Sequence, residues 1–247
     1  MATNFHGKAA FVTGGSRGIG AAVVQRLAND GAAVAFTYKG SAEQAEALAA
    51  RLRESGARVL AIQADAADAA ALKRAVDQAA REFGKLDILV NNAGVFALAT
   101  VSELALEDFD RMLDVNVRSV FVASQAALAH MGDGGRIINI GSCNAERMPF
   151  VGGAAYAMSK SALVGLVKGM ARDLGPRGIT VNNVQPGPTN TDMNPATGDF
   201  AGSMHDLMAL KRHARPEEIA AMVAYVASDE AAFVTGASLT IDGGFNA

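Results

Sequence analysis

The sequence predicts a single-domain α/β protein with a doubly wound parallel sheet of about seven strands and helices on both faces. Short β-branched apolar runs alternate with longer Ala-, Leu- and Val-rich stretches of helical spacing, the order typical of right-handed βαβ units. The strand runs, such as Ile88-Leu89-Val90, are apolar without alternation, as expected when both faces of a sheet are covered. No linker, low-complexity tract or long charge run divides residues 1–247, so we expect one domain.

Each predicted strand is a short apolar run that ends at a polar or glycine-containing turn. In chain order, the strands are 9–13, 33–38, 58–63, 86–91, 136–141, 179–185 and 238–241. The helices, predicted from apolar residues at helical spacing, are 18–30, 42–55, 67–83, 103–131, 154–174 and 216–227. The segment 191–215 breaks this alternation and contains glycines and methionines. We expect it to be a substrate lid over a site.

Composition excludes several classes of protein. Of the 247 residues, 50% are hydrophobic, which is enough for a large core and excludes a mostly disordered chain. A net charge of −3 argues against a nucleic-acid-binding protein with a basic surface. The single cysteine, Cys143, and four scattered histidines predict neither a disulfide framework nor a metal site. With no signal region and no uncharged apolar run of about 18 residues, we expect a cytoplasmic protein without a membrane partner.

A glycine-rich turn follows the first predicted strand and opens the first predicted helix, and its sequence is Thr13-Gly14-Gly15-Ser16-Arg17-Gly18-Ile19-Gly20. Glycines let the backbone approach a pyrophosphate closely, and the free N–H groups at the start of a helix attract its negative charge. A tight turn without a ligand is the alternative, but the strand–turn–helix context favours a dinucleotide site. The predicted contacts in this turn are Gly14, Ser16, Arg17, Gly18, Ile19 and Gly20.

The spacing of this turn, with three residues between Gly14 and Gly18, resembles the short-chain dehydrogenase/reductase family. Further motifs resemble the family in its own order: Asn91-Asn92-Ala93-Gly94, Asn116, Ser142, Tyr156-Ala157-Met158-Ser159-Lys160, Pro186-Gly187 and Ile241-Asp242-Gly243-Gly244. Together they cover nearly the whole chain. The resemblance implies a Rossmann-type fold and an enzyme that transfers a hydride between a nicotinamide cofactor and a small carbonyl or alcohol substrate.

Asn116, Ser142, Tyr156 and Lys160 are the catalytic residues that the resemblance implies. Tyr156 and Lys160 are four residues apart on a predicted helix, so both project from one face. A free tyrosine titrates near pH ~10, too high for proton exchange at neutrality. Lowering that pKa by about 3 requires roughly 4 kcal/mol, which Lys160 and an oxidised nicotinamide would supply together. An ordinary amphipathic helix with Tyr156 packed and Lys160 exposed is the alternative.

The two other catalytic residues have supporting roles. Ser142 offers a neutral hydroxyl that polarises and orients the substrate oxygen. By resemblance, Asn116 holds a water that links Lys160 to solvent. The interval between Ser142 and Tyr156 is 14 residues, one more than in many family members, which indicates an altered loop.

Most of the remaining cofactor contacts are implied by the resemblance as well. Besides the glycine-rich turn, Tyr156 and Lys160, they are Tyr38, Lys39, Ser41, Asp65, Ala66, Asn92, Ala93, Gly94, Pro186, Gly187, Thr189 and Thr191. NAD-binding sites commonly end the second strand with an acid that would repel a 2′-phosphate. Tyr38 takes that position, Lys39 follows it, and Arg17 can reach the same ribose. We therefore predict that NADP(H) is preferred over NAD(H), the alternative being that Lys39 points into solvent.

The substrate is not identified by the sequence. Val95, Phe96, Asn144, Arg147, Met148 and Gln185 flank the motifs and are expected to line its pocket. Segments such as 138–149 and 175–188 resemble a narrower bacterial subgroup described as binding cyclic-di-GMP, so a nucleotide-binding regulator on a reductase scaffold is the alternative function. The intact catalytic set favours the enzyme, because a pure binder would not require all four residues. The family also implies a homotetramer.

Overall fold

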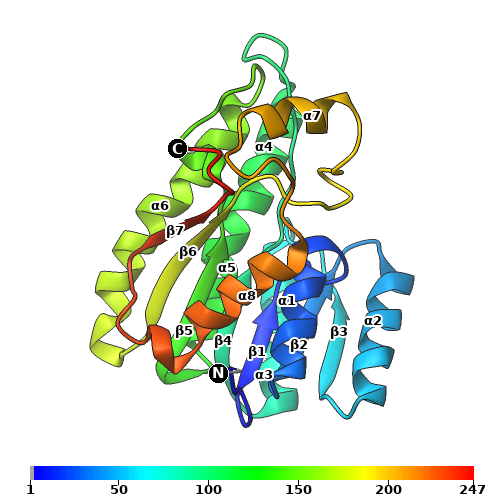
Figure 1. Ribbon diagram of the computed structural model, residues 1–247. Helices are drawn as coiled ribbons and strands as arrows, with labels where there is room; N and C mark the ends of the chain where they lie inside the picture. The colour runs from blue at the N-terminus through cyan, green and yellow to red at the C-terminus, as the bar shows by residue number, and fades with distance from the viewer. Residues whose placement is uncertain (1–2) are drawn as a thin grey trace.

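The computed structural model describes residues 3–247 and contains one seven-stranded sheet in the order β3-β2-β1-β4-β5-β6-β7 (Figure 1). All neighbouring strands are parallel, so the predicted fold class is confirmed. The strands are β1 (Ala9–Val12), β2 (Ala33–Tyr38), β3 (Val59–Gln63), β4 (Leu86–Asn91), β5 (Met131–Ile140), β6 (Thr180–Pro186) and β7 (Ser238–Ile241). Within residues 3–247, no helix is both long enough and apolar enough to cross a membrane.

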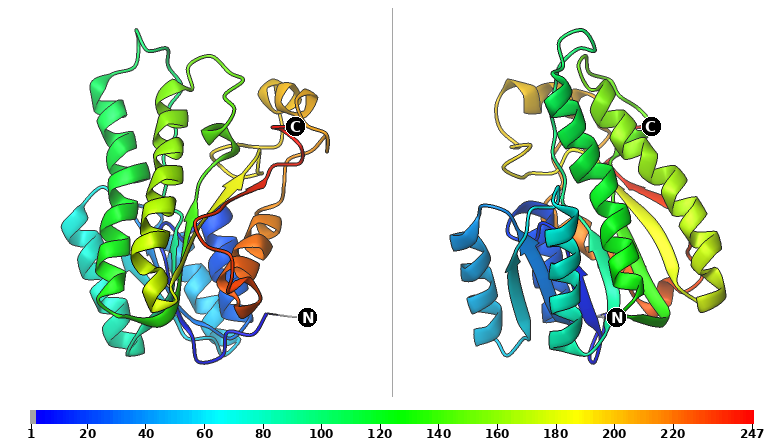
Figure 2. Two further views of the ribbon diagram at one scale, coloured as in Figure 1. Left: turned by 90° about the vertical axis from the view of Figure 1, so that its left-hand side faces the viewer. Right: turned by 180° about the vertical axis from the view of Figure 1, so that it is seen from behind.

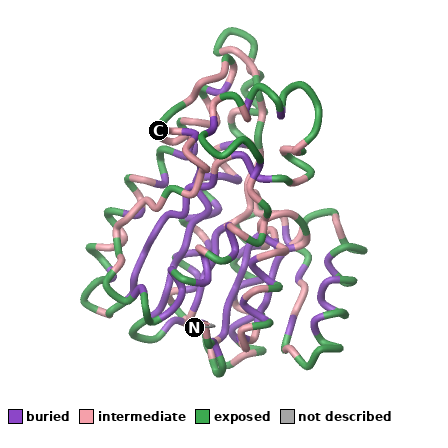
Figure 3. Tube along the Cα trace, in the orientation of Figure 1, coloured by how far each residue is buried: buried purple, intermediate pink, exposed green. Residues whose placement is uncertain are grey.

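Helices cover both faces of the sheet (Figure 2). One face packs against α1 (Gly18–Asn29), α2 (Ala42–Glu54) and α8 (Pro216–Ala227), and the other against α3 (Ala69–Phe83), α5 (Ser119–Leu128) and α6 (Ala154–Leu174). Along β1, Ala10 and Val12 join the first core and Phe11 joins the second. Both faces of the central strands are therefore buried (Figure 3), which explains their continuous apolar runs.

The structure departs from the predicted element boundaries by more than two residues in three places. The helix expected over 103–131 is α4 (Leu106–Leu113), a π-helical turn (Asp114–Arg118) and then α5. Strand β5 begins five residues earlier than expected, because Met131 pairs with Leu86 across a register shift. The segment 191–215, expected to be a lid outside the alternation of strands and helices, contains a helix that was not predicted, α7 (Asp199–Asp206), whose Ala201 and Met204 are buried.

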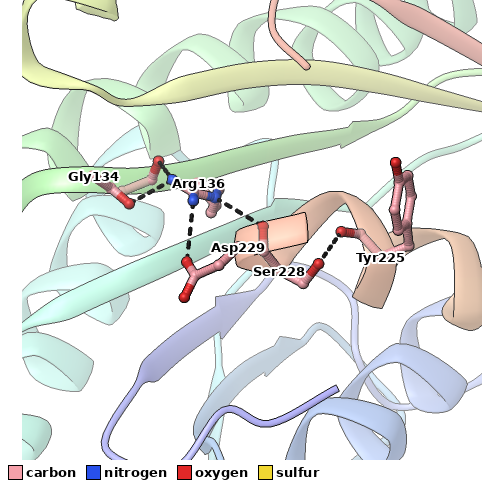
Figure 4. A network of polar contacts seen from close by, with 6 residues as sticks. Gly134, Arg136, Tyr225, Ser228 and Asp229 are labelled. Atoms are coloured by element: carbon pink, nitrogen blue, oxygen red, sulfur yellow. Dashed lines mark hydrogen bonds and ion pairs between the residues drawn. The ribbon is translucent and has the colours of Figure 1, made fainter. Parts of the chain in front are cut away.

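A buried arginine holds the amino-terminal part of β5 in place (Figure 4). Arg136 is 7% exposed, and its Nη1 donates to the carbonyl oxygen of Gly134 at 2.6 Å. Its Nη2 pairs with Asp229 Oδ1 at 3.3 Å, and its Nε donates to the Ser228 carbonyl oxygen at 3.5 Å. These contacts tie β5 to the end of α8, so Arg136 serves the fold rather than a reaction.

The strand order places a binding crevice at a defined point. The chain builds outward from β1 to β3 and then returns to add β4 on the other side of β1. The connections that leave β1 and β4 therefore diverge at the carboxyl ends of these strands. In open α/β sheets, such a point is where ligands bind.

Candidate active site

A cleft of about 580 Å³ lies over the carboxyl ends of the strands, where β1 and β4 part. Of the predicted catalytic and cofactor-binding residues, all except Asn116 line it. The turns after six strands and the segment at 186–194 contribute to its wall. The fold thus brings together motifs that are spread from residue 14 to residue 191 of the chain.

The glycine-rich turn after β1 is shaped as a cradle in which side chains do not fit. Gly14 has φ +66°, a conformation that favours glycine. A Cβ at Gly20 would lie 2.2 Å from the Gly14 carbonyl oxygen and 2.4 Å from Asn92 Nδ2. Because α1 begins at Gly18, the amino end of a helix also faces the cleft. This backbone geometry fits the phosphate groups of a dinucleotide.

Side-chain hydrogen bonds fix the floor of the cleft between β1 and β4. Thr13 Oγ1 accepts hydrogen bonds from the amides of Asn92 and Ala93, each at 2.9 Å. In return, Asn92 Nδ2 donates to the carbonyl oxygens of Thr13 and Gly14, at 3.0 and 2.9 Å. Asn92 therefore shapes the glycine turn as well as lining the cleft.

The two cations predicted to meet a 2′-phosphate are both paired with acids. Lys39 Nζ lies 2.7 Å from Asp65 Oδ2, and Arg17 Nη1 lies 3.4 Å from Asp192 Oδ2. Burial acts to raise the pKa of Asp65, but Lys39 and the Ala67 amide outweigh it and hold that pKa below its usual value. Both cations are thus paired in this structure, while their side chains remain more than half exposed, and a role for Lys39 at a 2′-phosphate stays a prediction.

Ser142 and Tyr156 share one end of the cleft. Ser142 Oγ accepts from the Asn144 amide at 3.1 Å and donates to Asn144 Oδ1 at 3.2 Å. Tyr156 lies in the first turn of α6, with its ring edge-on to Phe96 at a centroid distance of 4.8 Å. The longer interval between Ser142 and Tyr156 contains a short 3₁₀ turn (Cys143–Ala145) and still brings both hydroxyls to the cleft.

Lys160 is buried one turn after Tyr156 and faces its ring rather than binding its hydroxyl. Its Nζ donates to the Ile140 carbonyl oxygen at 2.9 Å and lies 5.8 Å from the centre of the Tyr156 ring. Burial lowers the pKa of Lys160 to about 8, so the ammonium form predominates at neutral pH.

The expected fall in the pKa of Tyr156 does not occur in the protein alone. Burial raises the pKa of Tyr156 to about 12, although the Ser142 hydroxyl opposes the rise. The loss of hydration outweighs any effect of Lys160, because that ammonium is engaged by Ile140. Lys160 by itself therefore does not activate the phenol.

Asn116 is buried on the π-helical turn and lies outside the cleft wall. Its Oδ1 accepts from the Val95 amide at 2.9 Å, and its Nδ2 donates to the Val95 carbonyl and to Ser159 Oγ, each at 3.0 Å. It thus joins the loop after β4 to α6. A Cβ at Gly94 would lie 3.6 Å from both Asn116 Oδ1 and Lys160 Nζ, so both side chains lie beside Gly94. Its role in a water relay stays a prediction.

The expected substrate pocket is partly wrong. Val95, Phe96, Asn144 and Met148 line the cleft, whereas Arg147 and Gln185 do not. Arg147 Nη1 donates to the Phe245 carbonyl oxygen at 2.6 Å, and the fully buried Gln185 donates to Glu146 Oε1 at 2.8 Å. Met193, Phe200 and Met204 line the cleft from the segment that was expected to be a lid, whereas Leu98, Arg111, Val115, Phe150 and Phe245 are lining residues that the sequence did not indicate. These residues belong to no motif. The one sequence signal near them is the pair Gly243-Gly244, which indicates a turn just before Phe245.

The Cys143 thiol is not a candidate for the reactive group. Burial raises the pKa of the Cys143 thiol to about 12, so it remains protonated and packs as an apolar group. The described part of the chain holds no group of three or more His, Cys, Asp or Glu side chains arranged to bind a metal. The candidate reactive groups that line this cleft are the hydroxyls of Ser142 and Tyr156 and the ammonium of Lys160.

Known proteins match this chain along almost its full length. A family model described as enoyl-(acyl carrier protein) reductase matches residues 14–246. The cyclic-di-GMP-binding biofilm dispersal mediator protein of Escherichia coli K12 is 52% identical over 243 residues, which are 98% of this chain and 99% of that protein.

Solved structures agree with this relationship. A short-chain dehydrogenase/reductase from Serratia marcescens is 68% identical and superposes with a TM-score of 0.97, covering 98% of this chain and 99% of that one. A short-chain dehydrogenase from Burkholderia cenocepacia, solved with NADP, is 55% identical with a TM-score of 0.97, covering 99% and 100%. The motifs, the fold and these matches agree, and the chain therefore belongs to the short-chain dehydrogenase/reductase family.

Proposed function

We propose that this protein is an NADP(H)-dependent oxidoreductase that reduces a small carbonyl substrate, or oxidises the corresponding alcohol, with Tyr156 as acid and base. The observation that carries the proposal is one cleft with a glycine cradle and two cations toward one end, and Ser142, Tyr156 and Lys160 at the other. The related Burkholderia structure with NADP supports the choice of cofactor.

Residues along the cleft fit the successive parts of the cofactor. The glycine cradle would hold the pyrophosphate, and Arg17, Lys39 and Ser41 would meet the 2′-phosphate beside Tyr38. Asp65 and Ala66 would contact adenine, Lys160 the nicotinamide ribose, and Thr189 and Thr191 the carboxamide or a phosphate. When bound, NADPH supplies the hydride.

Tyr156 moves the proton in this proposal. Its pKa of about 12 keeps the phenol protonated at neutral pH, which suits a proton donor to a carbonyl oxygen that is gaining negative charge. Ser142 donates a hydrogen bond to the same oxygen, after giving up its bond to Asn144 Oδ1. In the oxidation direction the Tyr156 phenol must first lose its proton. The positive charges of Lys160 and an oxidised nicotinamide together would favour that loss.

The direct test is NADPH oxidation followed against a panel of aldehydes and ketones, beside calorimetry with cyclic-di-GMP. Turnover of a carbonyl supports the proposal. The Escherichia coli relative is named as cyclic-di-GMP-binding, which favours a nucleotide-binding regulator as the second candidate. Cyclic-di-GMP binding without turnover of any carbonyl would support that candidate instead.

We further propose that residues 191–215 form a lid that orders over bound ligands. Within this segment, α7 is joined to the chain before α8 by hydrogen bonds between His205 Nε2 and His213 Nδ1 at 2.7 Å and from Lys211 Nζ to the Asp206 carbonyl oxygen at 3.0 Å. The Arg17–Asp192 ion pair joins its first residues to the glycine turn, and both side chains are exposed enough for water to weaken that pair. Backbone hydrogen bonds from Leu210 to Gly243 and from Ala214 to Pro188 hold the end of the segment, so the part that opens locally in this proposal is the part before them, with α7.

Amide hydrogen exchange in residues 191–215 is expected to slow when NADPH is added, because a bound phosphate and carboxamide give this segment new contacts. Mass spectrometry with and without the cofactor measures the change. The remote turn at Asp229–Ala231 is the internal reference and should exchange equally in both states. Equal exchange across 191–215 as well would mean a static loop.

The assembly proposed for this protein is a homotetramer in the cytoplasm. Large apolar side chains on α4, α5 and α6 remain exposed in the single chain, namely Leu106, Phe121 and Met158. Contact between copies would remove them from water. Sedimentation equilibrium measures the number of chains directly.

A further inference from the structure

Two histidines join the helix of the proposed lid to the chain that anchors it. His205 lies on α7, and His213 follows eight residues later, between α7 and α8. His205 Nε2 and His213 Nδ1 are 2.7 Å apart, and the two rings are nearly perpendicular, with centroids 4.9 Å apart. At this distance one of the facing nitrogens carries a hydrogen and the other a lone pair. The bond therefore exists only while at least one of these two nitrogens is unprotonated.

The residue after His213 belongs to the held part of the fold. The Ala214 amide donates to the Pro188 carbonyl oxygen, and the Asn190 amide donates to the Ala214 carbonyl oxygen, each at 2.9 Å. Between Pro188 and Asn190 lies Thr189, which is buried and lines the cleft at the proposed nicotinamide end. His213 therefore lies at the boundary between the held end of the segment and the part that opens.

The other contacts of α7 are insensitive to pH near neutrality. Its apolar side chains are partly buried, and the Phe200 ring packs on that of Phe150 at 5.4 Å between centroids. Lys211 Nζ donates to the Asp206 carbonyl oxygen, and a lysine keeps its charge throughout the range in which histidine titrates. Of the attachments that the structure describes, the bond from His205 is the one that protonation in this range changes.

His213 is the ring that resists a positive charge. It is 5% exposed, and its Nε2 is buried with no hydrogen-bond partner among the residues that the structure describes. Burial, and after it the neighbouring His205, lower the pKa of His213 below the ordinary value of 6.5. A proton added to the buried ring would be a charge without hydration, which is costly.

The charged groups on the neighbouring elements do not offset this cost. They are Asp199 and Asp206 on α7, Lys211 and Arg212 after it, Arg215, Glu217 and Glu218 at the start of α8, Asp192 after β6 and Asp242 after β7. Both Nη atoms of Arg212 bind the Glu218 carboxylate at 2.7 Å. None of these described groups shifts the pKa of His213, on which burial and His205 act. The state of the pair is therefore set by its own two rings.

We propose that His205 and His213 form a pH-sensitive latch, which holds α7 closed at neutral pH and releases it in acid. The inference rests on the proposed lid. One added proton can be shared between the facing nitrogens, so the bond survives it. A second proton puts a hydrogen on both nitrogens and sets two like charges against each other. The rings then separate, and α7 withdraws Phe200 and Met204 from the wall of the cleft.

The direction of the pH dependence follows from the burial of His213. In the closed state its pKa lies below 6.5, whereas in the opened state the hydrated ring returns toward that ordinary value. Closure is therefore fully present above about pH 6.5 and is lost as the pH falls below it. Because opening takes up one proton, the closed population falls by at most about tenfold for each pH unit.

The test measures amide hydrogen exchange in α7 at about pH 7.5 and about pH 5, without added cofactor and with exposure times scaled for the pH dependence of intrinsic exchange. We expect the protection of α7 to be about tenfold lower at the acid pH, while the central strand β4 keeps its protection. Equal protection of α7 at both pH values would overturn the latch. A loss that extends to β4 would also overturn it, because that loss is general acid unfolding. Either result leaves the lid to its own comparison with NADPH.

Three variants locate the effect in the pair. His205→Ala removes the bond and should leave α7 weakly protected at both pH values. The amide of His205→Gln can donate to neutral His213 or accept from the protonated ring, so its protection should change by less than about threefold. His6→Ala is the matched control, because His6 is exposed near the start of β1, and it should respond as the wild type does. A wild-type pH response in either His205 variant would contradict the latch.

Discussion

Replacing Tyr156 with phenylalanine is expected to lower kcat by about 10²–10⁴-fold, the usual range for an acid–base group. The hydroxyl moves the proton, whereas the ring only packs against Phe96, so NADPH affinity should stay within several-fold of the wild type. Steady-state kinetics with the best carbonyl substrate and a fluorescence titration with NADPH measure the two quantities.

Tyr225→Phe is the matched control for this variant, because Tyr225 is exposed on α8 and outside the cleft. It should leave both kcat and NADPH affinity unchanged. An unchanged kcat in a pure preparation of Tyr156→Phe would remove Tyr156 from the reaction.

Lys160→Ala should instead lower both turnover and cofactor affinity, because the proposed contacts of Lys160 include the ribose as well as the phenol. The substitution also leaves the Ile140 carbonyl without its donor, which costs about 1–3 kcal/mol of stability at a buried acceptor. Thermal unfolding therefore belongs beside the kinetics. Lys168→Ala, at an exposed position of α6, is the control. Retained NADPH affinity in folded Lys160→Ala would exclude the ribose contact.

The double variant Arg17→Ala with Lys39→Ala should weaken NADPH binding far more than NADH binding, because only NADPH carries the 2′-phosphate. A charge-assisted contact contributes about 1.5–3 kcal/mol. Both cations must first leave or share their acids, Asp192 and Asp65, so we expect the lower end of that range for each. Together this amounts to about 3 kcal/mol, or roughly 10²-fold in the dissociation constant for NADPH.

Calorimetric titration with each cofactor measures this selectivity. Arg51→Ala with Lys73→Ala removes the same charges from exposed positions on α2 and α3 outside the cleft and should alter neither affinity. If the wild-type protein shows equal or higher kcat/KM with NADH than with NADPH, the prediction of NADP(H) preference is wrong.

The sequence by itself determined the fold class and the position of the cradle. Strands that are buried on both faces must be apolar throughout, as in Ile88-Leu89-Val90, and a helix needs apolar residues at its own spacing. These are local constraints, so the chain displays them directly. The turn from Gly14 to Gly20 is local too, because one strand, one turn and one helix build it. Where the local pattern was weak, the observed elements differ from the predicted ones, as at β5 and at α7.

Only the tertiary structure decided what the side chains do inside the cleft. The partners of Lys39 and Arg17 come from other turns, with Asp192 lying 175 residues beyond Arg17. The rise in the pKa of Tyr156 comes from burial by the assembled site. Four phenylalanines line one cleft only because separate segments converge at the carboxyl ends of the strands, namely Phe96, Phe150, Phe200 and Phe245. Arg147 and Gln185 lie outside the cleft lining for the same reason, because each binds a residue from a distant part of the chain, Phe245 and Glu146 respectively. Desolvation and ion pairing depend on which distant groups share a space, and this is fixed by packing rather than by any local pattern.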